Sequence, residues 1–135
     1  MQPIEKRWLE VQMYNNLLKV YHINNDIQDV MVLLELICHL FQIPSEPLKM
    51  LASKMLYSLR TRPTKKEYAV LANYFKVPIV QIAEHTGYKL QYLYNVIKTW
   101  DMSNANIYNN EYSDTEYALM DTFLKKSHEL KEWLL

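Results

Sequence analysis

The sequence predicts an all-α, multi-helix protein, and three observations carry this prediction. The chain of 135 residues contains one glycine and five prolines, so it offers few places for the tight hairpins of β-sheets. Apolar residues recur along most of the chain at the three- and four-residue spacing of amphipathic helices. Thr64 with Glu67 and Ser113 with Glu116 have the spacing of capping boxes, which begin helices. A chain of this length is expected to fold as one compact unit, residues 1–135.

The N-terminal segment, residues 1–60, is predicted to form three helices. Pro3 opens the first, which runs to about Tyr21. Asp26 caps a more apolar helix over 27–41, which is expected to be central to the core. The third begins at Ser45. The apolar positions expected to face the core are Ile4, Trp8, Val11, Leu17 and Leu18, then Val30, Leu33, Leu34, Ile37, Leu40 and Phe41, then Leu48, Leu51, Met55, Leu56 and Leu59.

Residues 64–100 are predicted to form three further helices, the last two joined at the only glycine. Gly87 can supply the left-handed turn that other residues adopt at a steric cost, and the small Ala83 lets the next helix cross closely. The last helix is expected over 88–100, with Tyr94 facing the core. An apolar seam between the two helices is expected from Ile82, Leu93, Val96 and Ile97.

This pattern resembles helix-turn-helix DNA-binding proteins as a class, over residues 64–100. Thr86 stands where many members have an aliphatic residue, and Tyr88 replaces an aliphatic side chain after the glycine. The resemblance implies a tri-helical unit whose last helix reads DNA. The residues expected to meet base edges are Lys89, Gln91, Tyr92 and Asn95, and those expected to hold phosphates are Arg60, Arg62, Lys65, Lys66 and Lys98.

Charge is segregated along a chain that is neutral overall. Residues 49–100 hold nine positive and two negative side chains, whereas residues 1–48 and 101–135 are both net acidic. A positive centre attracts phosphates, so this segregation favours a nucleic-acid partner. Solvated lysines on helix surfaces are the alternative interpretation.

The C-terminal part is predicted to hold a polar connection over 101–113 and an amphipathic helix over 114–135. The connection has turn-forming asparagines, so a short wing after the recognition helix is one interpretation and an irregular loop is the other. The apolar stripe of the helix either packs as core or serves as a dimer or partner interface. Its members are Tyr117, Met120, Phe123, Leu124, Leu130, Trp133 and Leu134.

Enzymatic chemistry has little support in the sequence. The chain has no glycine-rich phosphate loop, no paired cysteines and no histidine pair at metal-ligand spacing, so we expect no catalytic residues, metal or cofactor. Cys38 lies in an apolar helix and is expected to be a buried structural thiol. No apolar run approaches the length of a membrane span, and we expect a soluble, cytoplasmic protein.

Two functional hypotheses follow. The first is a transcriptional regulator that binds duplex DNA, favoured over single-stranded DNA, and that acts as a dimer because one short recognition helix gives little affinity. The second is a protein-interaction or adaptor subunit of a replication complex, docking through the C-terminal helix and binding DNA weakly or as single strands. In composition the chain resembles proteins of low-GC Gram-positive bacteria and their phages or mobile elements.

Overall fold

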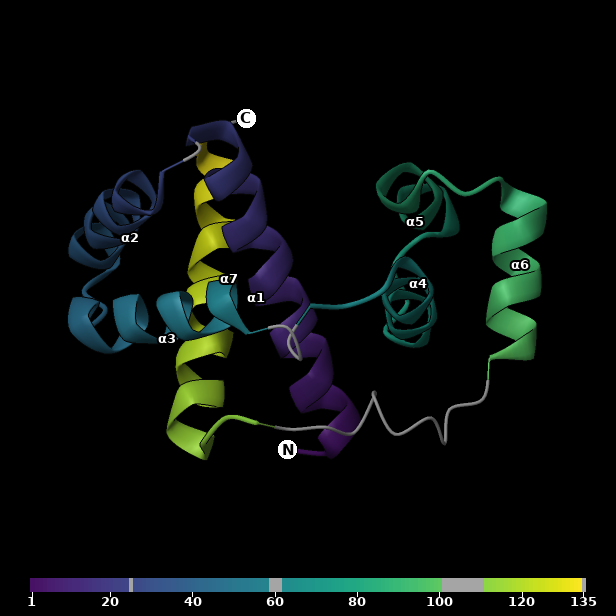
Figure 1. The fold of residues 1–135 in the computed structure, drawn as a ribbon, viewed down its shortest axis with the longest axis horizontal. Coiled ribbons are helices and arrows are strands. Elements are labelled where there is room, and N and C mark those ends of the chain that lie inside the picture. Colours follow the sequence, from purple (N-terminus) through teal and green to yellow (C-terminus); the bar gives the residue numbers. More distant parts are fainter. Residues whose placement is uncertain (25, 59–61, 101–110, 135) are drawn as a thin grey trace. The chain divides into compact units, whose positions relative to one another are not determined.

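The computed structural model is helical and has no strand in the residues it describes, which confirms the predicted all-α class. These residues are 1–24, 26–58, 62–100 and 111–134, with only the backbone described over 20–24 and 130–134. The helices are α1 (Pro3–Asn24), α2 (Ile27–Phe41), α3 (Ser45–Tyr57), α4 (Lys65–Tyr74), α5 (Ile79–Thr86), α6 (Leu90–Thr99) and α7 (Asp114–Leu134) (Figure 1). The wing suggested for the connection falls on residues 101–110, which lie outside this description.

Local side-chain bonds set several of the helix ends. The Asp26 carboxylate accepts a hydrogen bond from the Gln28 N–H at 2.9 Å and caps α2, whose bounds match the prediction. Before α7, the Ser113 hydroxyl accepts from the Glu116 N–H at 3.2 Å, and the Ser113 N–H donates to the Glu116 carboxylate at 2.9 Å. This reciprocal pair confirms the second capping box.

The chain divides into two compact units, where the sequence predicts a single one over residues 1–135. Unit 1 comprises Met1–Trp8 and Pro63–Asn110, and unit 2 comprises Leu9–Arg62 and Glu111–Leu135. The beginning of α1 therefore groups with α4, α5 and α6, although the sequence assigns it to an N-terminal segment of residues 1–60. Contacts of Arg7 and Trp8 with α4 and the residue that follows it account for this grouping.

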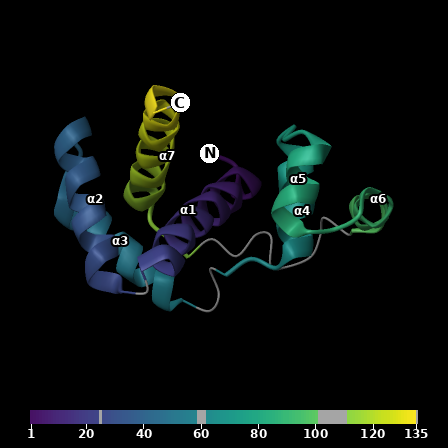
Figure 2. The ribbon, with the colours of Figure 1, turned by 90° about the horizontal axis from the view of Figure 1, so that it is seen from above.

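Unit 2 is built from the rest of α1 with α2, α3 and α7. Helices α2 and α3 lie side by side in both views (Figures 1 and 2). The core cluster of this unit consists of Met13, Tyr14, Leu17, Val30, Leu34, Cys38, Ile43, Leu48, Leu51, Ala52, Met55, Tyr112, Tyr117, Met120 and Phe123. Two α2 positions expected in the core, Leu33 and Leu40, are exposed instead. Because α2 is apolar nearly all round, the sequence pattern does not distinguish its buried side from its exposed side.

Unit 1 consists of α4, α5 and α6 packed against one another, with the start of α1. Its core cluster is Ala69, Ala72, Ile82 and Leu93. The Trp8 ring stacks on Phe75 with centroids 5.6 Å apart and an interplanar angle of 7°. Trp8 also contacts Tyr68, with ring centroids 5.8 Å apart. Aromatic packing thus supplements a small aliphatic core.

A buried ion pair ties the start of α1 to α4 within unit 1. The Arg7 guanidinium donates to both carboxylate oxygens of Glu67, at 3.2 Å from Nε and 2.6 Å from Nη2. Both side chains are almost fully buried. The Thr64 hydroxyl accepts from the Glu67 N–H at 3.1 Å, but the Glu67 carboxylate accepts from Arg7 in place of the expected Thr64 N–H. The prediction of a reciprocal capping box is therefore wrong at its second half, because a charged partner far along the chain binds the carboxylate more strongly.

Among the described residues, none of the helices combines the length and the apolar character that crossing a bilayer requires.

Candidate nucleic-acid interface

The turn between α5 and α6 is built around Gly87. Its φ of +75° lies in the left-handed region, and its N–H donates to the Ala83 carbonyl at 2.8 Å, as in a helix C-cap. Thr86 is buried, and its hydroxyl donates to the Ile82 carbonyl at 2.8 Å and accepts from the Tyr88 N–H at 3.3 Å. These bonds satisfy the buried hydroxyl, which explains how a threonine occupies a site expected to be aliphatic.

The apolar seam fixes the orientation of α6. Ile82, Leu93 and Val96 are buried, and Ile97 packs partly buried against the same cluster, as predicted. On α4, the fully buried side chains in this cluster are Ala69 and Ala72. Small side chains allow close approach of two helix backbones, and Ala83, for which the sequence suggested this role, packs partly buried against the same cluster. The remaining faces of α6 point outward.

The outward face of α6 carries every base-reading candidate. Gln91, Asn95 and Lys98 follow at helical spacing and are all exposed, so they share one face. Lys89 precedes the first turn as the N-cap residue and is also exposed. An open hollow of about 600 Å³ is lined by Lys89, Gln91, Tyr92, Tyr94, Asn95 and Lys98. The helix contains no aspartate or glutamate to repel a phosphate.

Two tyrosines flank this polar ridge. Tyr92 is exposed, and its ring meets Tyr88 edge-on with centroids 4.9 Å apart. The sequence predicts that Tyr94 faces the core, and this prediction is wrong because its side chain is 58% exposed. Leu93 and Val96 already occupy the inward positions of the helix, which leaves Tyr94 on the opposite side. The helical positions of the aliphatic residues in the sequence therefore already indicate that Tyr94 faces away from the core.

The two units differ in their net charge. Unit 1 contains seven lysines and arginines against four aspartates and glutamates, and unit 2 contains eight against eleven. In unit 1, Arg7 neutralises Glu67, and Lys65 and Lys66 are exposed at the start of α4. The exposed carboxylates described in unit 1 are Glu5 and Glu84. The surface of unit 1 is thus predominantly cationic.

The predicted phosphate contacts do not all belong to the same unit. Arg62 is grouped with unit 2, where its Nε donates to the Tyr14 hydroxyl at 2.9 Å. Lys49 and Lys54, which contribute to the positive centre of the sequence, also belong to unit 2 and pair with carboxylates. Arg60 lies outside the described residues. Lys65, Lys66 and Lys98 belong to unit 1, as does α6.

The C-terminal apolar stripe packs as core over the part that the structure describes. Tyr117, Met120 and Phe123 are buried within unit 2, so they are not available to a dimer or protein partner as proposed. Leu124 is partly buried. The side chains of Leu130, Trp133 and Leu134 lie outside the description. The burial of these side chains supports the interpretation as core, and not as an interface, for the N-terminal half of the stripe.

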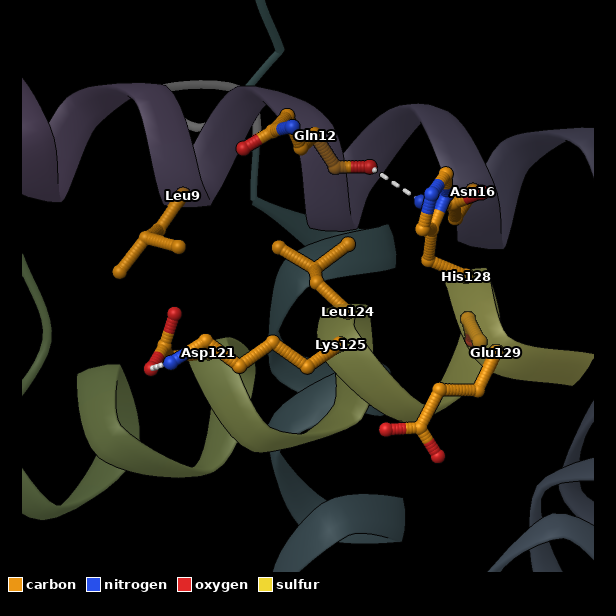
Figure 3. Close-up of a pocket in the computed structure, with 9 residues that line it drawn as sticks. Leu9, Gln12, Asn16, Asp121, Leu124, Lys125, His128 and Glu129 are labelled. Carbon is orange, nitrogen blue, oxygen red and sulfur yellow. Dashed lines mark hydrogen bonds and ion pairs between the residues drawn. The ribbon is translucent and has the colours of Figure 1, made fainter.

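A second hollow, of about 550 Å³, lies between α1 and α7 within unit 2 (Figure 3). Several polar groups at its rim are bonded to one another. Asp121 pairs with Lys125 at 2.9 Å, and the Asn16 amide donates to the Gln12 carbonyl at 3.0 Å. Glu129 pairs with Lys126 at 3.5 Å. In the described part of the chain, no three His, Cys, Asp or Glu side chains come together as metal ligands.

Comparison of the chain with protein-family models, curated proteins and solved structures gave no match. The geometry of the α6 face is therefore the basis for a functional assignment.

Proposed function

We propose that this protein binds duplex DNA through the outward face of α6 and acts as a transcriptional regulator. The observation that carries the proposal is the α6 face, where exposed Lys89, Gln91, Asn95 and Lys98 line one hollow. Amide and amino side chains make hydrogen bonds to base edges, and an α-helix fits the major groove.

Each side chain has a role that follows from its chemistry. Gln91 and Asn95 can bond an adenine through two atoms at once, which makes them the candidates for base discrimination. Lys98 at the end of α6 and Lys65 and Lys66 at the start of α4 carry charge without a fixed geometry, which suits phosphate oxygens. Lys89 lies at the N-terminal end of the recognition helix, where base contacts usually occur.

A charge-reversal pair tests whether α6 is the binding face. Lys89→Glu with Lys98→Glu should weaken binding to random duplex at least tenfold at low salt, because two cationic contacts become repulsive. The dependence of log K on log salt should flatten by about two units, because each neutralised phosphate contributes about one unit to the slope. Fluorescence anisotropy of labelled duplex over a salt series measures both quantities.

The matched control carries the same change of net charge in unit 2. Lys19 and Lys125 are exposed there, and Lys19→Glu with Lys125→Glu should leave affinity and salt dependence close to those of the unmodified protein. Equal binding by the α6 pair and the control pair would reject α6 as the interface.

Sequence preference separates a regulator from an adaptor. A regulator should select one duplex from a random library and prefer it by a factor of roughly 10³ or more over random duplex. Asn95→Ala should then reduce that preference by about 1–3 kcal/mol while leaving non-specific affinity nearly unchanged. An affinity that is uniform over all duplexes would favour the adaptor.

Single-stranded DNA is a second candidate ligand, and the two exposed tyrosines on α6 favour it. Tyr92 and Tyr94 present open rings beside Lys89 and Lys98, and unpaired bases stack on such rings. Tyr94→Ala should weaken binding of a single-stranded oligonucleotide by about 1–3 kcal/mol under this alternative. Under the duplex proposal the unmodified protein binds duplex more tightly than either of its separated strands.

A further inference from the structure

We propose that the exposed face of α2 is the interface of a homodimer in which two copies of α2 pack antiparallel about a two-fold axis. This proposal does not depend on DNA binding, because α2 belongs to unit 2 and the candidate recognition helix to unit 1. It replaces the C-terminal stripe as the association surface, because Tyr117, Met120 and Phe123 of that stripe are buried and Leu124 is partly buried.

Helix α2 is apolar on both of its sides. Val30, Leu34 and Cys38 face the core of unit 2 and are buried. On the other side, Val32, Leu36 and Leu40 are 58%, 56% and 65% exposed, and Leu33 lies beside them at 36%. A row of exposed aliphatic side chains on one helix, unlike a single exposed leucine, indicates a contact surface.

The exposed residues form one continuous ridge, here called the α2 ridge: Val32, Leu36 and Leu40, with Leu33 at its edge. The three ridge residues follow at intervals of four, so they lie in one row that spans about 12 Å along the helix. Two rows of this kind interdigitate when helices cross at about −50°, which is the commonest class of helix packing. The same row on a second copy therefore fits the grooves beside it.

Polar groups at the two ends of α2 favour a second copy running in the opposite direction. Asp29 lies in the first turn and His39 in the last turn, and both are exposed. An antiparallel two-fold brings Asp29 of each copy next to His39 of the other, with Val32 opposite Leu36. A carboxylate can then accept a hydrogen bond from an imidazole N–H at both ends of the interface. The antiparallel arrangement also places opposite ends of the two helix dipoles together.

The composition of α2 disfavours a membrane as the occupant. Helices that bind a membrane surface carry lysines and arginines on their polar side, and α2 has neither, whereas it has Asp29 and Glu35. A contact between two identical surfaces about a two-fold axis needs only the α2 ridge with Asp29 and His39, and each copy of the chain provides these.

Two variants test the interface with a matched pair of valines. Val32 and Val80 are 58% and 57% exposed, and both lie on helices, but Val80 is on α5 in unit 1. Sedimentation velocity of the full chain over a concentration series should show a dimer for the unmodified protein and for Val80→Glu. Val32→Glu should raise the dimer dissociation constant at least about 100-fold, with an unchanged circular dichroism spectrum. A monomeric unmodified protein, or equal dimerisation of the two variants, overturns the proposal.

A charge exchange tests the direction of packing. His39→Glu places two carboxylates opposite each other at each end and should weaken the dimer about tenfold or more. Adding Asp29→Lys should restore it, because each lysine then faces the new glutamate of the other copy. In a parallel pair the two positions lie far apart, so failure of Asp29→Lys to restore the dimer overturns the antiparallel arrangement.

Discussion

Unit 1 and unit 2 are stabilised by different means. The core cluster described in unit 2 contains fifteen residues, most of them large and apolar. The cluster described in unit 1 contains four fully buried residues, and two of them, Ala69 and Ala72, are alanines. Because hydrophobic stabilisation scales with buried apolar area, unit 1 gains less from its core. It adds a buried ion pair and an aromatic stack from the start of α1.

This difference follows from what each unit presents to solvent. The outward face of α6 in unit 1 is polar and cationic, and small residues at the α4–α6 contact hold the helix close to its neighbours. A short helix with one polar, exposed face has fewer positions left for the core. The candidate interface therefore depends on residues remote from it in sequence, Arg7 and Trp8 above all.

The prediction with the largest expected effect removes one partner of the buried ion pair in unit 1. Glu67→Ala removes the carboxylate that the buried Arg7 guanidinium binds through two hydrogen bonds, and the expected loss in free energy of unfolding is about 3–5 kcal/mol. Arg7→Met with Glu67→Leu should recover most of this loss, since an apolar pair of similar volume removes both buried charges. Urea denaturation followed by circular dichroism measures both. A loss below about 1 kcal/mol for the single variant would mean that the pair contributes little to unit 1.

Removing a hydrogen-bond donor from the buried carboxylate of unit 2 should cost less free energy of unfolding. Glu10 is fully buried, and the Tyr117 hydroxyl donates to its Oε2 at 2.7 Å. Tyr117→Phe removes that donor and should lower the free energy of unfolding by about 1–3 kcal/mol. Tyr57, which is exposed, supplies the control, and Tyr57→Phe should change stability by less than about 0.5 kcal/mol. If Tyr117→Phe costs as much as Glu67→Ala, the contrast between the units fails.

Features that depend on neighbours in sequence were predictable. The cap at Asp26, the box at Ser113 and the turn at Gly87 all form through bonds to residues two to four positions away. Their physical cause is contained in a short window of sequence, and so the all-α class and the bounds of α2 follow from it. The exposure of Lys89, Gln91, Tyr92 and Asn95 also follows from the periodicity of α6.

Features that depend on distant partners were not predictable. The Glu67 carboxylate had a plausible local partner, and nothing in the pattern indicates that Arg7, sixty positions away, binds it instead. The side of α2 that faces the core is undetermined for the same reason, because apolar residues occur on both sides. Assignment of Arg62 to unit 2 likewise rests on its bond to Tyr14, 48 positions away.

Residues with a left-handed backbone conformation give a smaller test of the comparison, because each unit contains one that is not glycine. Gly87→Ala should cost about 1–2 kcal/mol through backbone strain alone, because no atom lies within 4 Å of the added methyl group. Lys76 in unit 1 and Gln42 in unit 2 have φ of 64° and 56°, so glycine relieves strain there. Glycine also raises the conformational entropy of the unfolded chain, which lowers the free energy of unfolding by about 0.4–1 kcal/mol. The expected net gain in the free energy of unfolding is therefore below about 1 kcal/mol.

Thermal or urea unfolding of Gly87→Ala, Lys76→Gly and Gln42→Gly measures these effects. Similar gains for Lys76→Gly and Gln42→Gly are expected, because the strain is local and independent of the size of either core. A loss at either position would mean that the lysine or glutamine side chain contributes contacts that outweigh its backbone strain.

The smallest test concerns chemical access and has no expected effect on stability. Cys38 is buried in the core of unit 2, and burial together with the nearby Glu35 carboxylate raises the pKa of its thiol. A raised pKa lowers the fraction of thiolate at any given pH, so reaction with a thiol reagent should be slow and begin at higher pH than for a free cysteine. The thiol introduced by Glu84→Cys on the exposed surface of unit 1 should react at once and serves as the reference. In denaturant both thiols should react at the same rate, and equal rates without denaturant would mean that the core of unit 2 opens as readily as the surface of unit 1.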